Sequence, residues 1–219
     1  MRESKEQLRV RSHKIVRLLK KAYPQPKTAL DFVNPLQLLI ATILSAQCTD
    51  EQVNKVTPTL FRKYPTARDF ANARPTELQH DIYSTGFYRN KTKNIIACCQ
   101  ELVNKHAGVV PDTMEQLVQL PGVGRKTANC VLGAAFGVQS GIVVDTHVMR
   151  LAVRMGLSRQ DDATKIERDL MVLVEQSDWY DFANMMILHG RNVCDARKPD
   201  CRACIVKTYC PSAGKFLKN

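Results

Sequence analysis

The 219-residue sequence has no apolar run that approaches the roughly 20 residues needed to cross a bilayer. Its start, MRESKEQLRVRSHK, has no apolar stretch after its charges, so it lacks the form of a secretory signal. Hydrophobic residues still make up 44% of the chain, which is enough for a buried core. These absences exclude secreted and membrane classes, and we expect a globular cytoplasmic protein.

Structural disulfides are also not expected, because they are rare in a reducing compartment. The chain nevertheless contains eight cysteines, which then indicate metal ligands or buried thiols. Four of them lie in helical patterns without ligand spacing, and we expect them to be buried small side chains: Cys48, Cys98, Cys99 and Cys130.

The formal charge of +11 is unevenly placed along the chain. Residues 1–30 contribute +7 and residues 191–219 contribute +5, whereas residues 31–190 sum to −1. A basic surface is the usual footprint of nucleic-acid binding. Solubility explains such a surface about equally well, so charge alone does not decide between them.

The hydrophobic pattern is helical nearly throughout and shows no strand pair, solenoid repeat or low-complexity linker, which predicts an all-α fold. Asn34 and Pro35 are typical of a helix start, as is Asp145 further on. Gly137 and Gly156 are typical helix ends. We expect helices over 35–47, 51–63, 75–84, 90–105, a short segment after 111–113, 124–136, 145–155, 162–176 and 179–190.

The last four cysteines have the spacing of one metal centre. Gaps of six, two and five residues separate Cys194, Cys201, Cys204 and Cys210. Loops this short can fold around a single site. Zinc prefers four tetrahedral sulfur ligands, commonly from two CxxC-like pairs, and only one is present. A cubane iron–sulfur cluster tolerates irregular spacing, so spacing alone leaves both metals open.

The segment 120–128 (LPGVGRKTA) joins two expected helices through a glycine turn. Gly122 and Gly124 permit positive φ and a close ligand approach. The amides of Val123, Gly124 and Arg125 are expected to face outward as a phosphate site at a helix start. A plain helix–helix connection explains the glycines equally simply.

Lys126 follows that turn and is a candidate nucleophile. A lysine attacks as a nucleophile only when its amine is neutral. Arg125 and the helix start both disfavour the protonated form of Lys126. Lys126 could equally be a phosphate contact, and Asp145 could simply cap its helix.

Together these features resemble the endonuclease III family of base-excision DNA glycosylases, within the helix-hairpin-helix superfamily. The resemblance runs from about Arg17 to Cys210. Its motifs are 44–47 (LSAQ), 120–128, 144–147 (VDTH) and 188–191 (LHGR), the last leading into the cysteine cluster.

The resemblance implies a two-lobed helix-hairpin-helix glycosylase fold. One lobe is a six-helix barrel over 28–138, and the other combines 1–27 with 139–219 around a [4Fe–4S] cluster. Double-stranded DNA with damaged bases or abasic sites would bind in the cleft between them. We expect a monomer with no membrane partner.

The resemblance also implies a reaction. Lys126 attacks the sugar C1′ of a flipped oxidised pyrimidine nucleotide and forms a Schiff base, and β-elimination then cuts the strand 3′ to the lesion. Asp145 is its catalytic partner. The implied DNA contacts are Gln47, Phe87, Gly122, Val123, Gly124, Arg125, Thr127, His147 and Arg191. The implied cluster ligands are Cys194, Cys201, Cys204 and Cys210.

The sequence departs from the family pattern at two of these places. Gln47 matches the position that fills the gap left by the flipped base. Phe87 stands in the wedge turn where other members often have leucine, which puts the opposite-base preference in doubt. Cys48 replaces a common alanine, with little expected consequence.

Two other functions compete with this prediction. Monofunctional mismatch glycosylases usually lack a lysine at the position of Lys126, and the adenine type carries an extra C-terminal domain that is not expected here. A non-enzymatic DNA-binding protein with structural zinc would keep the glycine turn and the basic ends. Such a protein would not need a paired Lys126 and Asp145.

Overall fold

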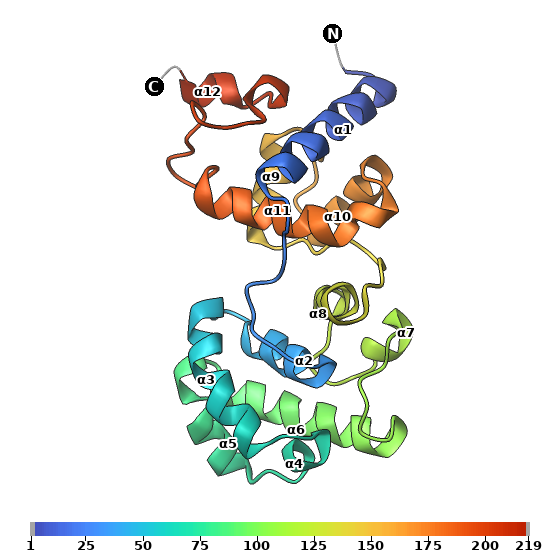
Figure 1. Cartoon of the computed structure of the whole chain (residues 1–219), viewed down its shortest axis with the longest axis vertical. Coiled ribbons are helices and arrows are strands. Elements are labelled where there is room, and N and C mark those ends of the chain that lie inside the picture. Colours follow the sequence, from blue (N-terminus) through green and yellow to red (C-terminus); the bar gives the residue numbers. More distant parts are fainter. Residues whose placement is uncertain (1–2, 218–219) are drawn as a thin grey trace. The chain divides into compact units, whose positions relative to one another are not determined.

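The computed structural model describes residues 3–217, and within that range the secondary structure is helical with no strand (Figure 1). The predicted all-α class is therefore confirmed. Contacts divide the chain into two compact units, Thr28–Val138 and Met1–Lys27 with Gln139–Asn219. None of the described helices combines the length and hydropathy needed to cross a membrane.

The unit 28–138 is built around the α6 helix, against which α2, α4 and α5 pack, while α8 packs on α2. The Asn34 side chain caps α2 by accepting from the Gln37 amide at 2.9 Å, as predicted from the Asn34-Pro35 start. The helices of this unit are α2 Pro35–Leu44, α3 Asp50–Lys63, α4 Ala67–Ala71, α5 Pro75–Asp81, α6 Tyr88–Lys105, α7 Met114–Leu117 and α8 Arg125–Val131, which continues as a π-helical segment Leu132–Phe136.

Three predicted boundaries in this unit were wrong. Helix α5 ends at Asp81 and not at residue 84, and a separate 3-10 turn Tyr83–Thr85 follows it. Helix α2 ends at Leu44 because the chain then turns, with Gln47 in the left-handed region at φ 53°. Helix α6 begins at Tyr88 because Phe87 precedes it in a left-handed conformation. The sequence also did not predict α4, which Thr66 starts with a capping box.

The other unit contains α1 Lys5–Ala22, α9 Thr146–Arg154, α10 Ala163–Leu173, α11 Trp179–Asn192 and α12 Ala213–Leu217. Its core includes the apolar face of α9, with Val148, Leu151 and Ala152 fully buried. Helix α1 was not predicted. Its buried residues Ile15 and Leu19 pack in the same core.

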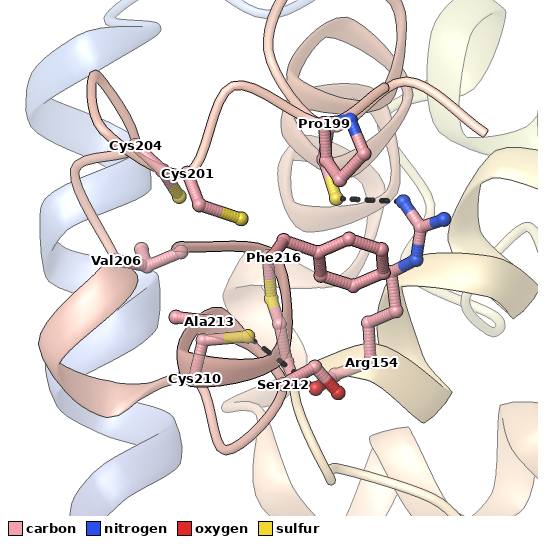
Figure 2. A pocket seen from close by; sticks show the side chains of 11 residues that line it. Arg154, Pro199, Cys201, Cys204, Val206, Cys210, Ser212, Ala213 and Phe216 are labelled. Carbon is pink, nitrogen blue, oxygen red and sulfur yellow. Dashed lines mark hydrogen bonds between the residues drawn. The ribbon is translucent and has the colours of Figure 1, made fainter. Parts of the chain in front are cut away.

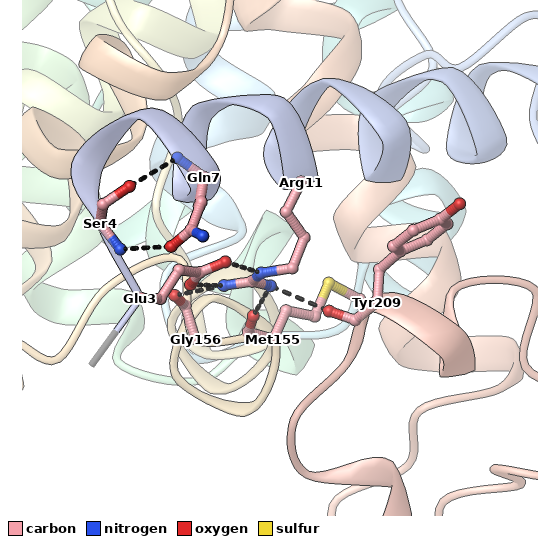
Figure 3. A network of polar contacts seen from close by, with 7 residues as sticks. All are labelled: Glu3, Ser4, Gln7, Arg11, Met155, Gly156 and Tyr209. Atoms are coloured by element: carbon pink, nitrogen blue, oxygen red, sulfur yellow. Dashed lines mark hydrogen bonds and ion pairs between the residues drawn. The ribbon is translucent and has the colours of Figure 1, made fainter. Parts of the chain in front are cut away.

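Arg11 connects α1 to two distant segments of its unit (Figure 3). Its guanidinium donates to the carbonyls of Met155 at 2.6 Å, Gly156 at 3.1 Å and Tyr209 at 2.9 Å. The first two carbonyls end α9, where backbone acceptors have no helical partner. Glu3 binds the same guanidinium, and this hydrogen bond lowers the pKa of Glu3.

We expect Arg11→Met to lower the free energy of unfolding by about 2–4 kcal/mol, because buried carbonyls lose their donor. Arg9, also on α1, is the matched control. Its nitrogen lies 3.8 Å from Glu175 and its side chain is 57% exposed, so Arg9→Met should change stability by less than about 0.5 kcal/mol. Urea unfolding of both variants measures this, and equal effects would contradict the role given to Arg11.

Candidate functional site

The turn between α7 and α8 requires a glycine at only one of its two glycine positions. Gly122 has φ +77°, and a Cβ built on it would lie 2.7 Å from the Cβ of Asn94 on α6. Gly124 has φ −91° and ψ 172°, and a Cβ there would meet nothing within 4 Å. The predicted positive φ therefore holds for Gly122 and was wrong for Gly124. The missing side chain of Gly124 leaves its backbone open to a close approach.

The prediction that the Val123 amide faces outward was also wrong. This amide donates to the Leu120 carbonyl at 3.1 Å and closes the turn, while the Val123 side chain is buried. The first hydrogen bond of α8 runs from Ala128 to the carbonyl of Gly124. The amides at the start of α8 therefore precede its helical ladder, as the amides of an anion-binding helix start do.

We expect Gly122→Ala to destabilise the protein by about 2–4 kcal/mol, because it combines an unfavourable φ with a clash. Gly124→Ala should change stability by less than about 1 kcal/mol, because its φ and ψ suit alanine. Thermal unfolding of the two variants compares these positions directly. Equal destabilisation would contradict the geometry of the turn.

Lys126 is exposed in the first turn of α8, while Ala128, Val131 and Leu132 on the same segment are buried. Its ammonium lies close enough to Cys130, one helical turn later, to oppose the rise that burial causes in the pKa of that thiol.

Two other groups lie near the Cys130 sulfur. The Thr42 hydroxyl of α2 lies 3.9 Å from it, and its hydrogen bond lowers the pKa of Cys130. The Asp50 carboxylate at the start of α3 raises that pKa. The start of α8, the face of α2 and the start of α3 therefore converge on one spot.

Gln47 and Phe87 share an unusual backbone conformation. They are two of only three non-glycine residues with positive φ in the described part of the chain, at 53° and 48°. Both side chains are exposed, Phe87 by 60%. Gln52, shortly after the first turn, donates to Ser84, shortly before the second, at 2.9 Å. Such conformations cost about 1–3 kcal/mol and cluster at functional sites.

Asp145 caps α9, as predicted, and both of its carboxylate oxygens are engaged. One accepts from the amides of His147 and Val148, each at 2.8 Å. The other lies 3.1 Å from Nδ1 of His147. The His147 ring therefore fixes the orientation of the carboxylate. The sequence prediction gave His147 only a DNA contact, although its spacing two residues after a helix cap was the available signal.

The four C-terminal cysteines line one pocket, together with Met155, Val206, Phe216 and other residues (Figure 2). Among the described residues, however, no three Cys, His, Asp or Glu side chains lie close enough to hold a single metal ion. A cubane spreads its thiolates over four iron corners, whereas one zinc draws them together. The donor set therefore fits a cluster better than a lone ion.

The electrostatics of this pocket also call for a cation. Burial, and then the neighbouring thiols, raise the pKa of Cys204 to about 11. Burial also raises the pKa of Cys201 and of Cys210. Neighbouring buried thiols ionise together only when a positive centre binds them. His189 is fully buried, with Nε2 3.4 Å from the Cys204 sulfur and Nδ1 3.1 Å from the Tyr23 hydroxyl. Burial lowers the pKa of His189 to about 4, so the ring is neutral.

Asx turns shape the loop between the cysteines. One oxygen of Asp195 accepts from the amides of Arg197 and Lys198, and one oxygen of Asp200 accepts from those of Arg202 and Ala203. These acids therefore hold the backbone, while basic side chains are exposed on the loop surface: Arg197, Lys198, Arg202 and Lys207. Arg191 is exposed in the last turn of α11 nearby in sequence.

The predicted site residues thus fall into two groups, each within one unit. The unit 28–138 holds Gln47, Phe87, Gly122, Val123, Gly124, Arg125, Lys126 and Thr127. The other unit holds Asp145, His147, Arg191, Cys194, Cys201, Cys204 and Cys210. Of the other four cysteines, Cys98 and Cys99 are fully buried as predicted, and Cys48 and Cys130 are only partly buried by residue exposure.

Residues 40–176 match the family model described as HhH-GPD superfamily base excision DNA repair protein. The chain is 54% identical over 203 residues to endonuclease III of Synechocystis sp. (strain PCC 6803), which covers 93% of each protein. The chain belongs to the endonuclease III family. The resemblance predicted from its motifs is confirmed, and membership makes the chain a base-excision DNA glycosylase.

Solved structures of the family agree with this assignment. An endonuclease III in a non-covalent complex with DNA is similar with a TM-score of 0.91 and 42% identity, covering 96% of this chain and 99% of that one. A trapped endonuclease III–DNA covalent intermediate with an estranged adenine gives a TM-score of 0.89 at 42% identity, covering 94% and 98%. The predicted helix-hairpin-helix glycosylase fold is therefore confirmed.

Proposed function

We propose that this protein is a bifunctional DNA glycosylase and AP lyase that removes oxidised pyrimidines from duplex DNA, acting as a monomer. The observation that carries the proposal is an exposed lysine, Lys126, which directly follows the glycine turn in a member of the endonuclease III family. A related endonuclease III is known as a trapped covalent DNA intermediate. A lysine is the residue type that forms such an intermediate with a sugar aldehyde carbon.

In the proposed reaction, the neutral amine of Lys126 attacks C1′ of a flipped nucleotide and the glycosidic bond breaks. The departing base takes up a proton, and ring opening gives a protonated Schiff base. The iminium acidifies the C2′ hydrogen. Loss of that proton expels the 3′ phosphate, which cuts the strand 3′ to the lesion, and water then releases Lys126.

Asp145 belongs to the other unit, and we propose that it acts on the same nucleotide when DNA is bound. It accepts the proton that Lys126 must lose, or stabilises positive charge developing on the sugar. The amide and imidazole contacts of His147 support this role, because they hold the carboxylate in one orientation. Helix capping and catalysis use the same carboxylate and do not compete.

We propose that Gln47 fills the gap left by the flipped base and that Phe87 wedges into the opposite strand. Their exposure and strained backbone support these roles, because the fold maintains a costly conformation at two exposed residues. Arg125, Thr127, His147 and Arg191 complete the proposed contacts to the DNA backbone, together with the turn residues Gly122 and Gly124.

Gly124 provides a test of the turn that is separate from catalysis. If a phosphate approaches this open backbone, Gly124→Ala should weaken binding to an abasic-site duplex about tenfold, the cost of losing a charge-assisted hydrogen bond. The free energy of unfolding should be nearly unchanged. Fluorescence anisotropy measures the affinity. An unchanged affinity would contradict the proposal that this turn binds a phosphate.

We also propose that Cys194, Cys201, Cys204 and Cys210 hold a [4Fe–4S] cluster. The shared pocket supports the proposal, because all four cysteines line it. When bound, the cluster supplies the positive centre that pairs with the thiolates. The chain supplies the rest, because the loop that bends around the cysteines presents Arg197, Lys198 and Arg202 to DNA.

A duplex with one oxidised pyrimidine tests the proposed activity. The protein should release the free base and cut the strand, and borohydride should trap a protein–DNA adduct. Base release without cleavage or adduct would indicate a monofunctional enzyme. No base release from such a duplex would remove oxidised pyrimidines as the substrate class.

A further inference from the structure

One side of the cysteine pocket is closed by an aromatic ring from the C-terminal helix. Phe216 of α12 lines the pocket together with the four cysteines. In Figure 2 its ring extends into the pocket toward Arg154. Phe216 is 36% exposed, so the residue is partly open to solvent while it also lines the pocket. Phe216 therefore occupies the boundary between solvent and the site.

Arg154, the last residue of α9, holds this ring and the cysteine loop at once. Its Nη1 donates to the Cys194 sulfur at 3.4 Å and to the Asp195 carbonyl at 2.6 Å, and its Nη2 donates to the Ala196 carbonyl at 2.6 Å. The Phe216 ring lies with its centre 5.1 Å from the guanidinium carbon, as in a cation–π contact. The guanidinium thus fixes Phe216 relative to Cys194.

We infer that Phe216 is a cap that excludes water and small oxidants from the group bound by the cysteines, and that Arg154 positions this cap. The inference rests on the proposed iron–sulfur cluster. The apolar shell around such a site controls solvent access, and solvent access controls how easily the site is oxidised. Three of the four cysteines are only partly buried, so shielding at the edge of the pocket matters for them.

A competing explanation is that the ring packs on Arg154 merely to fasten α12 to the surface. Leu217, the next residue of the same helix, separates the two explanations. It is 41% exposed and does not line the pocket. If Phe216 only fastens the short helix, replacing its neighbour Leu217 should have a similar effect. If the Phe216 ring is a cap, only its own replacement should have an effect.

The test uses the full-length protein purified without oxygen, as wild type, Phe216→Ala, Phe216→Leu and Leu217→Ala. Iron and sulfide are measured first. Wild-type protein without iron and sulfide would reject the cluster itself, whatever the variants do. The loaded proteins are then mixed with ferricyanide, which takes electrons from the cluster and is reduced to ferrocyanide, and the loss of visible absorption is followed.

We expect Phe216→Ala to lose absorption on the order of tenfold faster than wild type, the lower end of what loss of an outer-shell partner costs a metal site. Phe216→Leu should restore most of the protection, because it refills the opening with apolar atoms. Leu217→Ala should match wild type. Equal rates in wild type and Phe216→Ala, or equal acceleration in Leu217→Ala, would overturn the inference.

Thermal unfolding of the loaded proteins provides a second readout. The cap predicts that Phe216→Ala changes the oxidation rate far more than it changes the melting temperature of the unoxidised protein. A rate increase that merely follows a loss of stability, across all three variants, would assign Phe216 a structural role and reject the cap.

Discussion

Lys126→Ala should abolish both strand cleavage and borohydride trapping while leaving affinity for an abasic-site duplex within a few-fold of wild type. Loss of a covalent nucleophile typically lowers turnover by roughly 10⁴- to 10⁶-fold. Folding should be unaffected, because Lys126 is exposed and the buried residues of α8 are unchanged. Single-turnover cleavage assays and gel analysis of the trapped adduct measure these effects.

Lys105→Ala is the matched control for this variant. Lys105 is an exposed lysine of the same unit, and its amine lies 2.9 Å from Glu101 in a surface ion pair. The Lys105→Ala protein should cleave the strand and form the borohydride-trapped adduct like wild type. If Lys126→Ala still formed the adduct at an undiminished rate, another amine would be the nucleophile.

Cys201→Ala should lower the stability of the protein by more than about 3 kcal/mol, because a metal site contributes its binding free energy to folding. Arg154, Arg11 and α12 all depend on the segment that the cysteines organise. DNA affinity should therefore fall together with iron content. Iron analysis, thermal unfolding and DNA binding measured on one preparation test this.

Cys48→Ala serves as its control, because Cys48 lies outside the pocket and in the other unit. It should keep iron, stability and affinity. A Cys201→Ala protein that stayed folded and bound DNA normally, with only the chemical step lost, would contradict the division of labour between the cysteine site and Lys126.

Local signals in the sequence predicted the elements that depend on local energetics. Asn34 and Asp145 were predicted as caps, and each makes the expected side-chain hydrogen bonds. Gly137 and Gly156 were predicted as helix ends, and both have positive φ. These residues act on the backbone within a few positions, so their effect is visible in sequence.

Features that depend on distant contacts escaped prediction. Helix α1 has seven hydrophobic residues among seven lysines and arginines. Its place follows from Arg11 meeting carbonyls far along the chain. The left-handed backbone of Phe87 has no composition signal, so the start of α6 was misplaced. The amide of Val123 is used by its own turn, which only the hydrogen-bond geometry reveals.

In the candidate site, too, the sequence predicted some features and missed those that depend on side-chain geometry. Family motifs indicated which residues belong to it, including Lys126, Asp145 and the four cysteines. They did not reveal that His147 holds the Asp145 carboxylate, nor that Phe216 lines the cysteine pocket. Both contacts are set by side-chain geometry, which spacing does not specify.

Peptide mapping of the borohydride-reduced adduct tests the proposed chemistry most directly. Wild-type protein is trapped on a duplex with one oxidised pyrimidine, the DNA is digested, and the modified peptide is sequenced by mass spectrometry. The sugar remnant should be found on Lys126 alone. A remnant on another lysine or on the N-terminal amine, or base release without any remnant, would contradict the assignment of Lys126 as the nucleophile.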